Sequence, residues 1–139
     1  MERAPELEAL ARRLYAAVST GDPAFFEEYL ARGASCVVIG TAPDEWWDDY
    51  AGALAAIRTQ MAVAGDAVSL TAGDVKAYRQ GDVGWVSDRP TFRLGSVAVP
   101  CRHTSVFARE NGAWRMVQHH FSIGVANEAI FGGEADRLG

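Results

Sequence analysis

The feature that most constrains the fold is a pair of β-rich segments, 97–109 and 113–125, separated by a short turn. The turn contains Asn111-Gly112, a pair that supplies the positive φ angles of a tight hairpin. The two segments therefore predict one long β-hairpin. All the histidines of the chain lie on it: His103, His119 and His120. The hairpin thus concentrates the groups that titrate near neutral pH.

Composition is typical of a globular protein of one-domain size. The chain has 139 residues, of which 49% are hydrophobic and 22% charged, and we expect one domain, 1–139. The net charge of −5 argues against nucleic acid or an anionic membrane as the main partner. We see no leader-like start and no apolar run of membrane length, so a cytoplasmic location is expected. Cys36 and Cys101 lie in apolar surroundings far apart, which favours two buried, reduced thiols.

The first half of the chain has the apolar spacing of helices. Gly21-Asp22-Pro23 combines a glycine that ends one helix, an aspartate that caps the next, and a proline in its first turn. Asp48 or Asp49 is expected to cap a third helix. The predicted elements are helices at 4–20, 23–31 and from the cap to about residue 63, and a short strand at 35–39.

Beyond Gly65 the pattern is that of strands. The predicted strands are 67–79, 83–94, 97–109 and 113–125. Strands this long must bend, and Gly73, Gly84 and Pro90 are the places where bulges would allow it. The predicted fold is α+β: three helices packed on a curved, mostly antiparallel sheet, a cone that encloses a pocket. The tail from residue 127 either drapes over a sheet edge or frays.

This order of elements, with Gly21-Asp22-Pro23 and the segment 112–122 (GAWRMVQHHFS), resembles the SnoaL-like, ketosteroid-isomerase-like group of the NTF2-like superfamily. The resemblance extends over about 5–126, and the segment 40–47 (GTAPDEWW) adds to it. It implies the NTF2-like cone. It does not imply one function, because the superfamily includes isomerases, polyketide cyclases, dehydratases and assembly domains.

The isomerase pattern is only partly present. The isomerases have an aspartate base on the first strand, where this chain has Val37-Val38-Ile39-Gly40. Their helix tyrosine aligns with Leu14, one residue from Tyr15, and their second aspartate aligns with His103 or Thr104. Isomerisation by the known steroid mechanism is therefore not expected.

The final hairpin also resembles the association domain of calcium/calmodulin-dependent kinase. That domain holds small carboxylates with arginines in its cone. The corresponding positions here are Ser105 and Phe121, so that clamp is missing from the hairpin. Arg89 and Arg93 on the preceding strand are possible replacements.

The register of the hairpin decides which histidines share a face, because side chains alternate along a strand. A three-residue turn places His103 opposite His119, whereas a two-residue turn pairs His103 with His120. We favour the first register, with His103 and His119 facing one cavity and His120 facing away. Both family comparisons place positions 103, 105, 117, 119 and 121 on the pocket side. No spacing of His, Cys and Asp supplies a third metal ligand, so neither metal nor cofactor is expected.

Four residues are candidates for acid or base chemistry. His103 or His119 would exchange the proton, Asp88 would act as base or orienter if it faces inward, and Tyr15 would donate a hydrogen bond. A bulge near Pro90 would instead turn Asp88 outward and Arg89 inward. The candidate ligand-binding residues are Trp46, Trp47, Arg89, Phe121, Val117 and Ser105.

Two functions remain open from the sequence. One is proton transfer of the isomerase, cyclase or dehydratase type on a polyketide- or steroid-like substrate, bound in a pocket for a small planar or aromatic molecule. The other is a non-catalytic ligand-binding or assembly domain. In either case we expect a homodimer through the outer face of the sheet, with Trp114 and Met116 as contacts.

Overall fold

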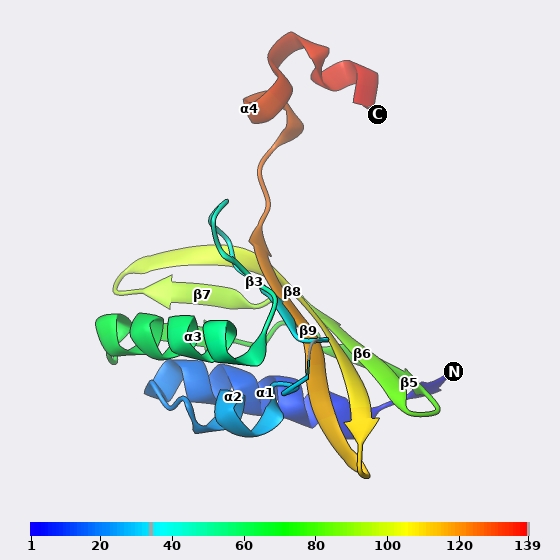
Figure 1. Ribbon diagram of the computed structural model, residues 1–139. Helices are drawn as coiled ribbons and strands as arrows, with labels where there is room; N and C mark the ends of the chain where they lie inside the picture. Colours follow the sequence, from blue (N-terminus) through cyan, green and yellow to red (C-terminus); the bar gives the residue numbers. More distant parts are fainter. Residues whose placement is uncertain (34, 139) are drawn as a thin grey trace.

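The structure is a computed structural model and describes residues 1–33 and 35–138. Three helices and a large sheet form the body, and a short helical tail follows the last strand (Figure 1). The helices are α1 (Pro5–Thr20), α2 (Ala24–Tyr29), α3 (Tyr50–Ala64) and, in the tail, α4 (Asn127–Phe131) followed by a 3₁₀ helix (Gly132–Leu138). The strands are β1 (Glu2–Arg3), β2 (Val37–Ile39), β3 (Trp46–Trp47), β4 (Val68–Thr71), β5 (Lys76–Gln80), β6 (Val83–Asp88), β7 (Thr91–Leu94), β8 (Val97–Glu110) and β9 (Ala113–Ile123).

The helix ends follow the sequence signals. Gly21 ends α1 with φ of 66°, and its N–H bonds the carbonyl of Val18 at 3.2 Å. Asp22 then accepts a hydrogen bond from the N–H of Ala24 at 3.0 Å, at the start of α2. For α3 the cap is Asp49, whose carboxylate accepts from Gly52 N at 2.6 Å.

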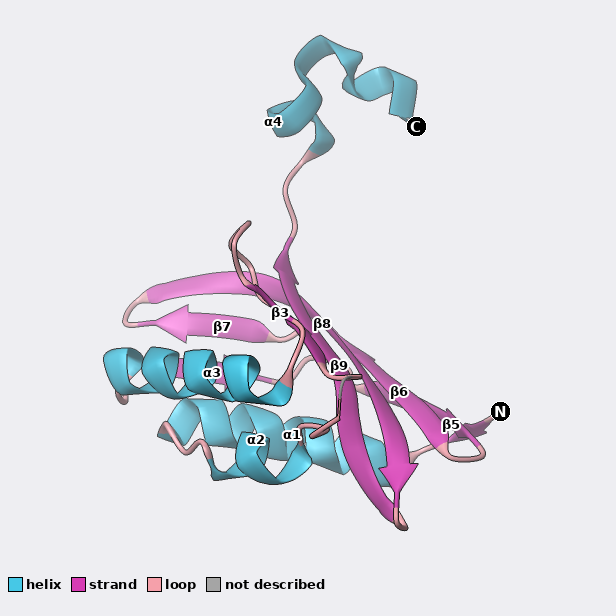
Figure 2. Cartoon of the chain, viewed as in Figure 1, coloured by secondary structure: helices cyan, strands magenta, loops and turns pink. Residues whose placement is uncertain are grey.

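The sheet order is β1-β5-β6-β8-β9-β2-β3, and β4 pairs with β7, which pairs with the first part of β8. Among the described strands all pairs are antiparallel except β2 with β9. The 14-residue β8 pairs first with β7 and then with β6, so the sheet curves along it. Helices α1, α2 and α3 lie on one face of this sheet (Figure 2). The predicted α+β cone is confirmed.

The predicted long strands are interrupted. The segment 67–79 divides into β4 and β5, and the segment 83–94 divides into β6 and β7 at Arg89-Pro90. Pro90 has no N–H for a ladder hydrogen bond, and its carbonyl accepts from Cys101 N at 2.9 Å across the break. Trp46 and Trp47, expected in a loop, form the short strand β3 against β2. The tail runs away from the body rather than over the sheet edge (Figure 1).

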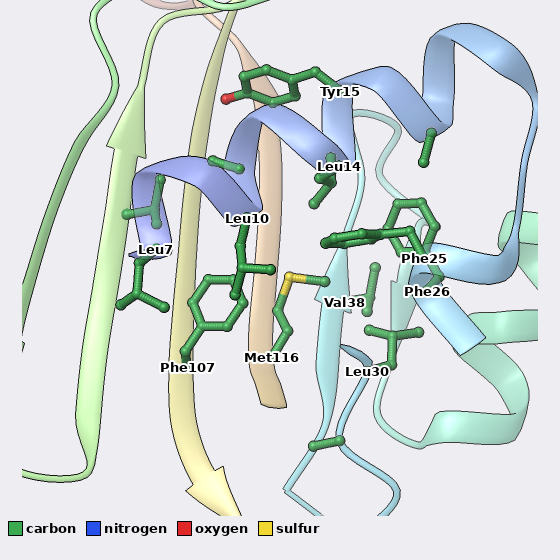
Figure 3. Close-up of a cluster of buried hydrophobic side chains, with 14 of the residues drawn as sticks. Leu7, Leu10, Leu14, Tyr15, Phe25, Phe26, Leu30, Val38, Phe107 and Met116 are labelled. Atoms are coloured by element: carbon green, nitrogen blue, oxygen red, sulfur yellow. The ribbon is translucent and has the colours of Figure 1, made fainter. Parts of the chain in front are cut away.

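The core lies between α1, α2 and the sheet (Figure 3). Its largest fully buried side chains include Phe107 and Met116 from the final hairpin and Leu7, Leu14 and Leu30 from the helical layer. Met116 was expected on the outer face of the sheet as a dimer contact, and this expectation is wrong, since its side chain is 0% exposed. Trp114, the other expected contact, is partly buried against the same core.

An extra residue in β9 explains this reversal. Asn111 and Gly112, with φ of 53° and 80°, form a two-residue turn that pairs Glu110 with Ala113. Farther along, Phe107 pairs with Met116 but Val106 pairs with Gln118, which leaves Val117 as a bulge. Beyond the bulge the odd-numbered residues of β9 face inward.

The expected pairing of His103 with His119 is therefore wrong, whereas the expected faces of the histidines are correct. His103 lies opposite Phe121, and Ser105 lies opposite His119. The side chains of His103 and His119 are both buried on the inner face, with ring centroids 5.0 Å apart. His120 alternates to the other face and is only half-buried.

Candidate functional site

A cavity of about 440 Å³ lies between α3 and the curved end of the sheet. Its wall is mostly apolar, as is usual for small-molecule sites. The sheet contributes Leu70, Phe92 and Phe121, and the helices contribute Phe26, Ile57 and Met61.

Glu45 and Gln60 form a polar pair at one side of this cavity. The Gln60 amide donates to Glu45 Oε2 at 2.8 Å, and the N–H of Ala42 donates to Glu45 Oε1 at 2.7 Å. Gly40 permits this close packing, because a Cβ there would lie 2.9 Å from the Glu45 Cβ. Glu45 is the one residue with a formal charge among the described lining residues. The cavity thus has no arginine or lysine, within the part of the chain described, to hold a carboxylate.

His119 provides the polar group of the sheet wall. Its ring lines the cavity and is only 8% exposed, between Phe26 and Phe121 at centroid distances of 6.1 and 5.1 Å. Ser105 Oγ lies 3.0 Å from Nδ1 of this ring. Nε2 is thus the ring nitrogen that no described residue hydrogen-bonds, and a ligand in the cavity is its available partner.

Behind His119 a row of buried polar groups continues into the protein. His103 Nε2 lies 2.7 Å from Ser105 Oγ, and His103 Nδ1 lies 2.7 Å from the Tyr15 hydroxyl. That hydroxyl also lies 2.9 Å from Asp88 Oδ2. We call this row, Asp88–Tyr15–His103–Ser105–His119, the buried relay.

Each part of the fold positions a member of the relay. Ser105 and His103 are two residues apart on β8, so both face inward. Asp88 lies on β6, directly opposite His103 in the sheet. Tyr15, labelled in Figure 3, reaches them from α1. Phe121 stacks on His103 at 4.8 Å with an interplanar angle of 8°.

Asp88 has a specific seat at the inner end of the relay. It is 6% exposed, and its Oδ2 also accepts from Gly73 N at 3.1 Å. A Cβ on Gly73 would overlap the carbonyl oxygen of Arg89, so the close approach requires glycine. Oδ1 of Asp88 is buried and has no hydrogen-bond partner among the described residues.

Burial controls the protonation of the relay. Desolvation, and then the neighbouring His120, lower the pKa of His119 from 6.5 to about 3. Desolvation and then the neighbouring His119 lower the pKa of His103 well below 6.5. Burial, followed by the Asp88 carboxylate, raises the pKa of Tyr15. Both imidazoles are therefore neutral at pH 7, and Tyr15 is a phenol.

The structure separates the sequence-predicted site residues into three groups. Those that line the cavity are His119, Phe121 and Trp47. Those in the relay behind it are Asp88, Tyr15, His103 and Ser105. Those outside the cavity wall are Trp46 and Arg89, both exposed, and Val117, which is partly buried at the bulge.

This distribution corrects several expectations. Asp88, rather than Arg89, faces inward, because β6 remains regular up to Asp88 and the chain breaks only afterwards. His103 was expected to face the cavity and instead lies one hydrogen bond farther in, behind Ser105. Ser105 was expected to contact ligand and instead joins the two histidines.

Sequence reasoning missed the Glu45–Gln60 pair. Glu45 lies in the conspicuous segment 40–47, but its partner is on α3, and only the fold brings the two together. Among residues 1–33 and 35–138 no group of three metal-ligating side chains converges. In the same part of the chain, no helix has the length and apolar character to cross a membrane.

The sequence and the fold were compared with known proteins. The SnoaL-like domain family matches residues 7–126. No curated protein has a matching sequence.

Solved structures of the NTF2-like type share the fold. An NTF2-like protein of unknown function from Pseudomonas putida has a TM-score of 0.75 at 17% identity, covering 85% of this chain and 84% of its own. A candidate dehydratase of the NTF2-like family from Streptomyces avermitilis has a TM-score of 0.71 at 20% identity, with coverages of 86% and 95%. A candidate association domain of calcium/calmodulin-dependent protein kinase type II from Thiobacillus denitrificans has a TM-score of 0.68 at 24% identity, with coverages of 85% and 94%. At these identities the likeness concerns the fold alone.

Proposed function

This chain belongs to the SnoaL-like domain family, and from that premise we propose that it binds a neutral, mostly apolar small molecule and transfers a proton on it. The observation that carries the proposal is the position of His119. It presents one unbonded ring nitrogen in a mostly apolar cavity and is held by the buried relay through the other nitrogen. The reaction would be of the isomerase, cyclase or dehydratase type.

The cavity chemistry supports a neutral ligand. Its volume of about 440 Å³ suits a molecule of a few fused rings, such as a planar polyketide or a steroid. Glu45 would repel a carboxylate, and no cation among the described lining residues would offset that repulsion. Small aromatic acids are therefore expected to bind more weakly than their neutral amides or esters.

A second function is favoured by the low pKa of His119. An imidazole with a pKa of about 3 is a weak base, so its Nε2 would serve well as a fixed hydrogen-bond acceptor for a ligand hydroxyl. In that case the protein binds its ligand and leaves it unchanged. The two functions share the cavity and differ only in whether a proton leaves the ligand.

The test is a thermal-shift screen of neutral polyketides, steroids and paired aromatic acids and amides, followed by incubation of each bound compound in D₂O. Deuterium incorporation or product formation is measured by mass spectrometry. His119→Gln is expected to lower turnover about 10²–10⁴-fold. The matched control is His120→Gln, which changes the neighbouring imidazole on the opposite face and is expected to keep parental turnover.

The outcomes separate the two functions. If bound compounds remain unchanged over hours in the parent protein, catalysis is refuted and the binding function stands. If no neutral compound binds, or if acids bind more tightly than their amides, the proposed ligand class is wrong.

We also propose a homodimer through the outer face of the sheet. The three helices of the body cover the other face (Figure 2). On the outer face Tyr78 and Trp85 form a neighbouring pair, with centroids 6.3 Å apart, and Val106 lies opposite Trp85. These three residues replace Trp114 and Met116 as the expected contacts.

We also propose a cytoplasmic location. The free, buried state of Cys36 and Cys101 agrees with a reducing compartment.

Light scattering at micromolar concentration tests the dimer. The expected mass is twice the 15.0 kDa of one chain, and Trp85→Glu is expected to yield the monomer. A parent protein that scatters as a 15.0 kDa monomer would rule out this assembly.

A further inference from the structure

The five polar groups of the buried relay form an unbroken series of hydrogen bonds from the cavity wall to Asp88. The four separations along it are 3.0, 2.7, 2.7 and 2.9 Å. All five members are buried, with exposures of 8% or less. The direction of each hydrogen bond therefore depends on the neighbouring groups rather than on water.

The carboxylate at the inner end determines these directions. An ionised Asp88 only accepts, so the Tyr15 hydroxyl must donate to it, and His103 must then donate from Nδ1 to the Tyr15 oxygen. Neutral His103 consequently accepts at Nε2, and the Ser105 hydroxyl donates to it. The Ser105 oxygen then accepts from Nδ1–H of His119.

The outcome at the cavity is specific. His119 holds its proton on Nδ1, and its Nε2 faces the ligand as a bare lone pair. Reversing every hydrogen bond gives the opposite state, in which Asp88 is protonated and Nε2–H of His119 is a donor. The same five groups thus support two states that differ by one proton on Asp88.

We propose that the buried relay is a proton wire and that Asp88, remote from the cavity, is the terminal acceptor of the proton that leaves the ligand. The inference rests on the proposed function and names the residue on which the charge ends. Asp88, Tyr15, His103 and Ser105 are positioning and relay residues in this scheme, and only His119 touches the ligand.

The step balances in protons and charge. His119 Nε2 takes the ligand proton while its Nδ1 proton passes to Ser105 Oγ, and the Ser105 proton passes to His103 Nε2. The Nδ1 proton of His103 passes to the Tyr15 oxygen, and the Tyr15 proton passes to Asp88 Oδ2. One N–H or O–H bond forms and one breaks at each of the four groups between the ligand and Asp88. At Asp88 an O–H bond forms, so Asp88 loses its negative charge, and the ligand, which loses the proton, gains one. Return of the proton along the same path completes an isomerisation.

Two features of the site favour this path over a charged histidine. Both imidazoles are buried, so an imidazolium at either position would be poorly solvated, and the wire keeps both rings neutral before and after transfer. At the other end, the orphaned Oδ1 leaves the Asp88 carboxylate incompletely solvated. Gaining a proton removes that poorly solvated charge.

The variant Asp88→Asn separates the acceptor from the scaffold. Gly73 N–H and the Tyr15 hydroxyl both donate to Oδ2, so the asparagine carbonyl is expected to take that place and keep every hydrogen bond in its direction. The variant can orient the relay but cannot take the proton. Ser105→Ala interrupts the relay between the two histidines by removing one oxygen.

The experiment has two independent readouts. The first is ¹⁵N NMR of the histidine rings in the ligand-free protein, where Nδ1–H is expected on both His103 and His119, in the parent and in Asp88→Asn. The second is turnover of a compound identified by the screen, which is expected to fall about 10²–10⁴-fold in Asp88→Asn and in Ser105→Ala while its binding changes less than about twofold.

Each result has a distinct meaning. Nε2–H on His119 in the parent overturns the proton direction, whether or not a substrate is known. Parental turnover by Asp88→Asn overturns Asp88 as the acceptor. A parent protein that binds ligand without converting it overturns the proposed function and with it the transfer step, while the tautomers still decide the direction of the hydrogen bonds.

Discussion

Lowering the pH from 7 to 5 is expected to destabilise this protein by ~2 kcal/mol through His119, and His103 acts in the same direction. Both rings are buried, and burial lowers their pKa values in the folded state, that of His119 from 6.5 to about 3. In the unfolded chain each ring regains the ordinary value of 6.5. Below pH 6.5 the unfolded state therefore binds protons that the folded state does not.

The sign and size follow from proton linkage. The free energy of unfolding is highest above pH 6.5. It decreases as the pH falls from 6.5 toward about 3, the pKa of His119 in the folded state. Proton binding to His119 in the unfolded chain lowers the free energy of unfolding by ~2 kcal/mol at pH 5 and by ~0.2 kcal/mol at pH 7. This ~2 kcal/mol is a substantial share of the ~5–15 kcal/mol typical of a domain, and His103, whose pKa burial also lowers, adds to it.

Urea unfolding at pH 7.0, 6.0, 5.5 and 5.0 measures the effect. The window is chosen because carboxylates, with ordinary pKa values of ~4, titrate mostly below it. His119→Gln should remove ~2 kcal/mol of the change in stability between pH 7 and pH 5 while lowering stability at pH 7. The matched control is His120→Gln, on the opposite face, and it should leave the dependence as in the parent. Equal pH dependence in the parent and in His119→Gln would refute the assignment of His119 as a buried neutral ring.

Three further predictions concern the fold. Asp49→Ala should cost ~1 kcal/mol in urea unfolding by removing the cap of α3, whereas Asp48→Ala, at the exposed neighbouring position, should cost nothing measurable; equal costs would argue against the cap. Gly84→Ala should cost ~1–3 kcal/mol, because a Cβ there overlaps Leu7 and lies 2.9 Å from the Tyr78 carbonyl; a neutral result would contradict this contact. Cys36 and Cys101 should react with iodoacetamide far more slowly in the folded than in the unfolded protein, since burial raises the pKa of both thiols and blocks access; peptide mapping that finds equal rates would exclude that burial.

Local signals in the sequence were sufficient for most of the architecture. Gly21-Asp22-Pro23 predicts the end of α1 and the start of α2, and Asn111-Gly112 predicts the hairpin turn, because each depends on backbone conformations that few residues adopt. The break between β6 and β7 was missed as a break, although Pro90 was identified as the place where the strand would bend.

The site was predictable as a set of residues but not as an arrangement. Asp88, Tyr15, His103 and His119 were each selected by type, and the structure brings all of them together. The order in which these residues contact one another depends on the bulge at Val117. Neither a turn residue nor the periodicity of β9 indicates an extra residue there. Ser105 therefore could not be recognised as the link between the two histidines.

The bulge also determines which of two neighbouring residues, His119 or His120, faces the interior. If β9 paired regularly from the same turn, Val117 would enter the ladder and His120, rather than His119, would face inward opposite His103. Ser105 would then face Gln118, and the row of hydrogen bonds would end at His103. The neighbouring residues His119 and His120 thus allow two registers of β9, and each register places one imidazole in the interior. Only the register with the bulge connects that imidazole to Asp88 through hydrogen bonds. A single unpaired residue in a strand therefore determines the arrangement of the whole site.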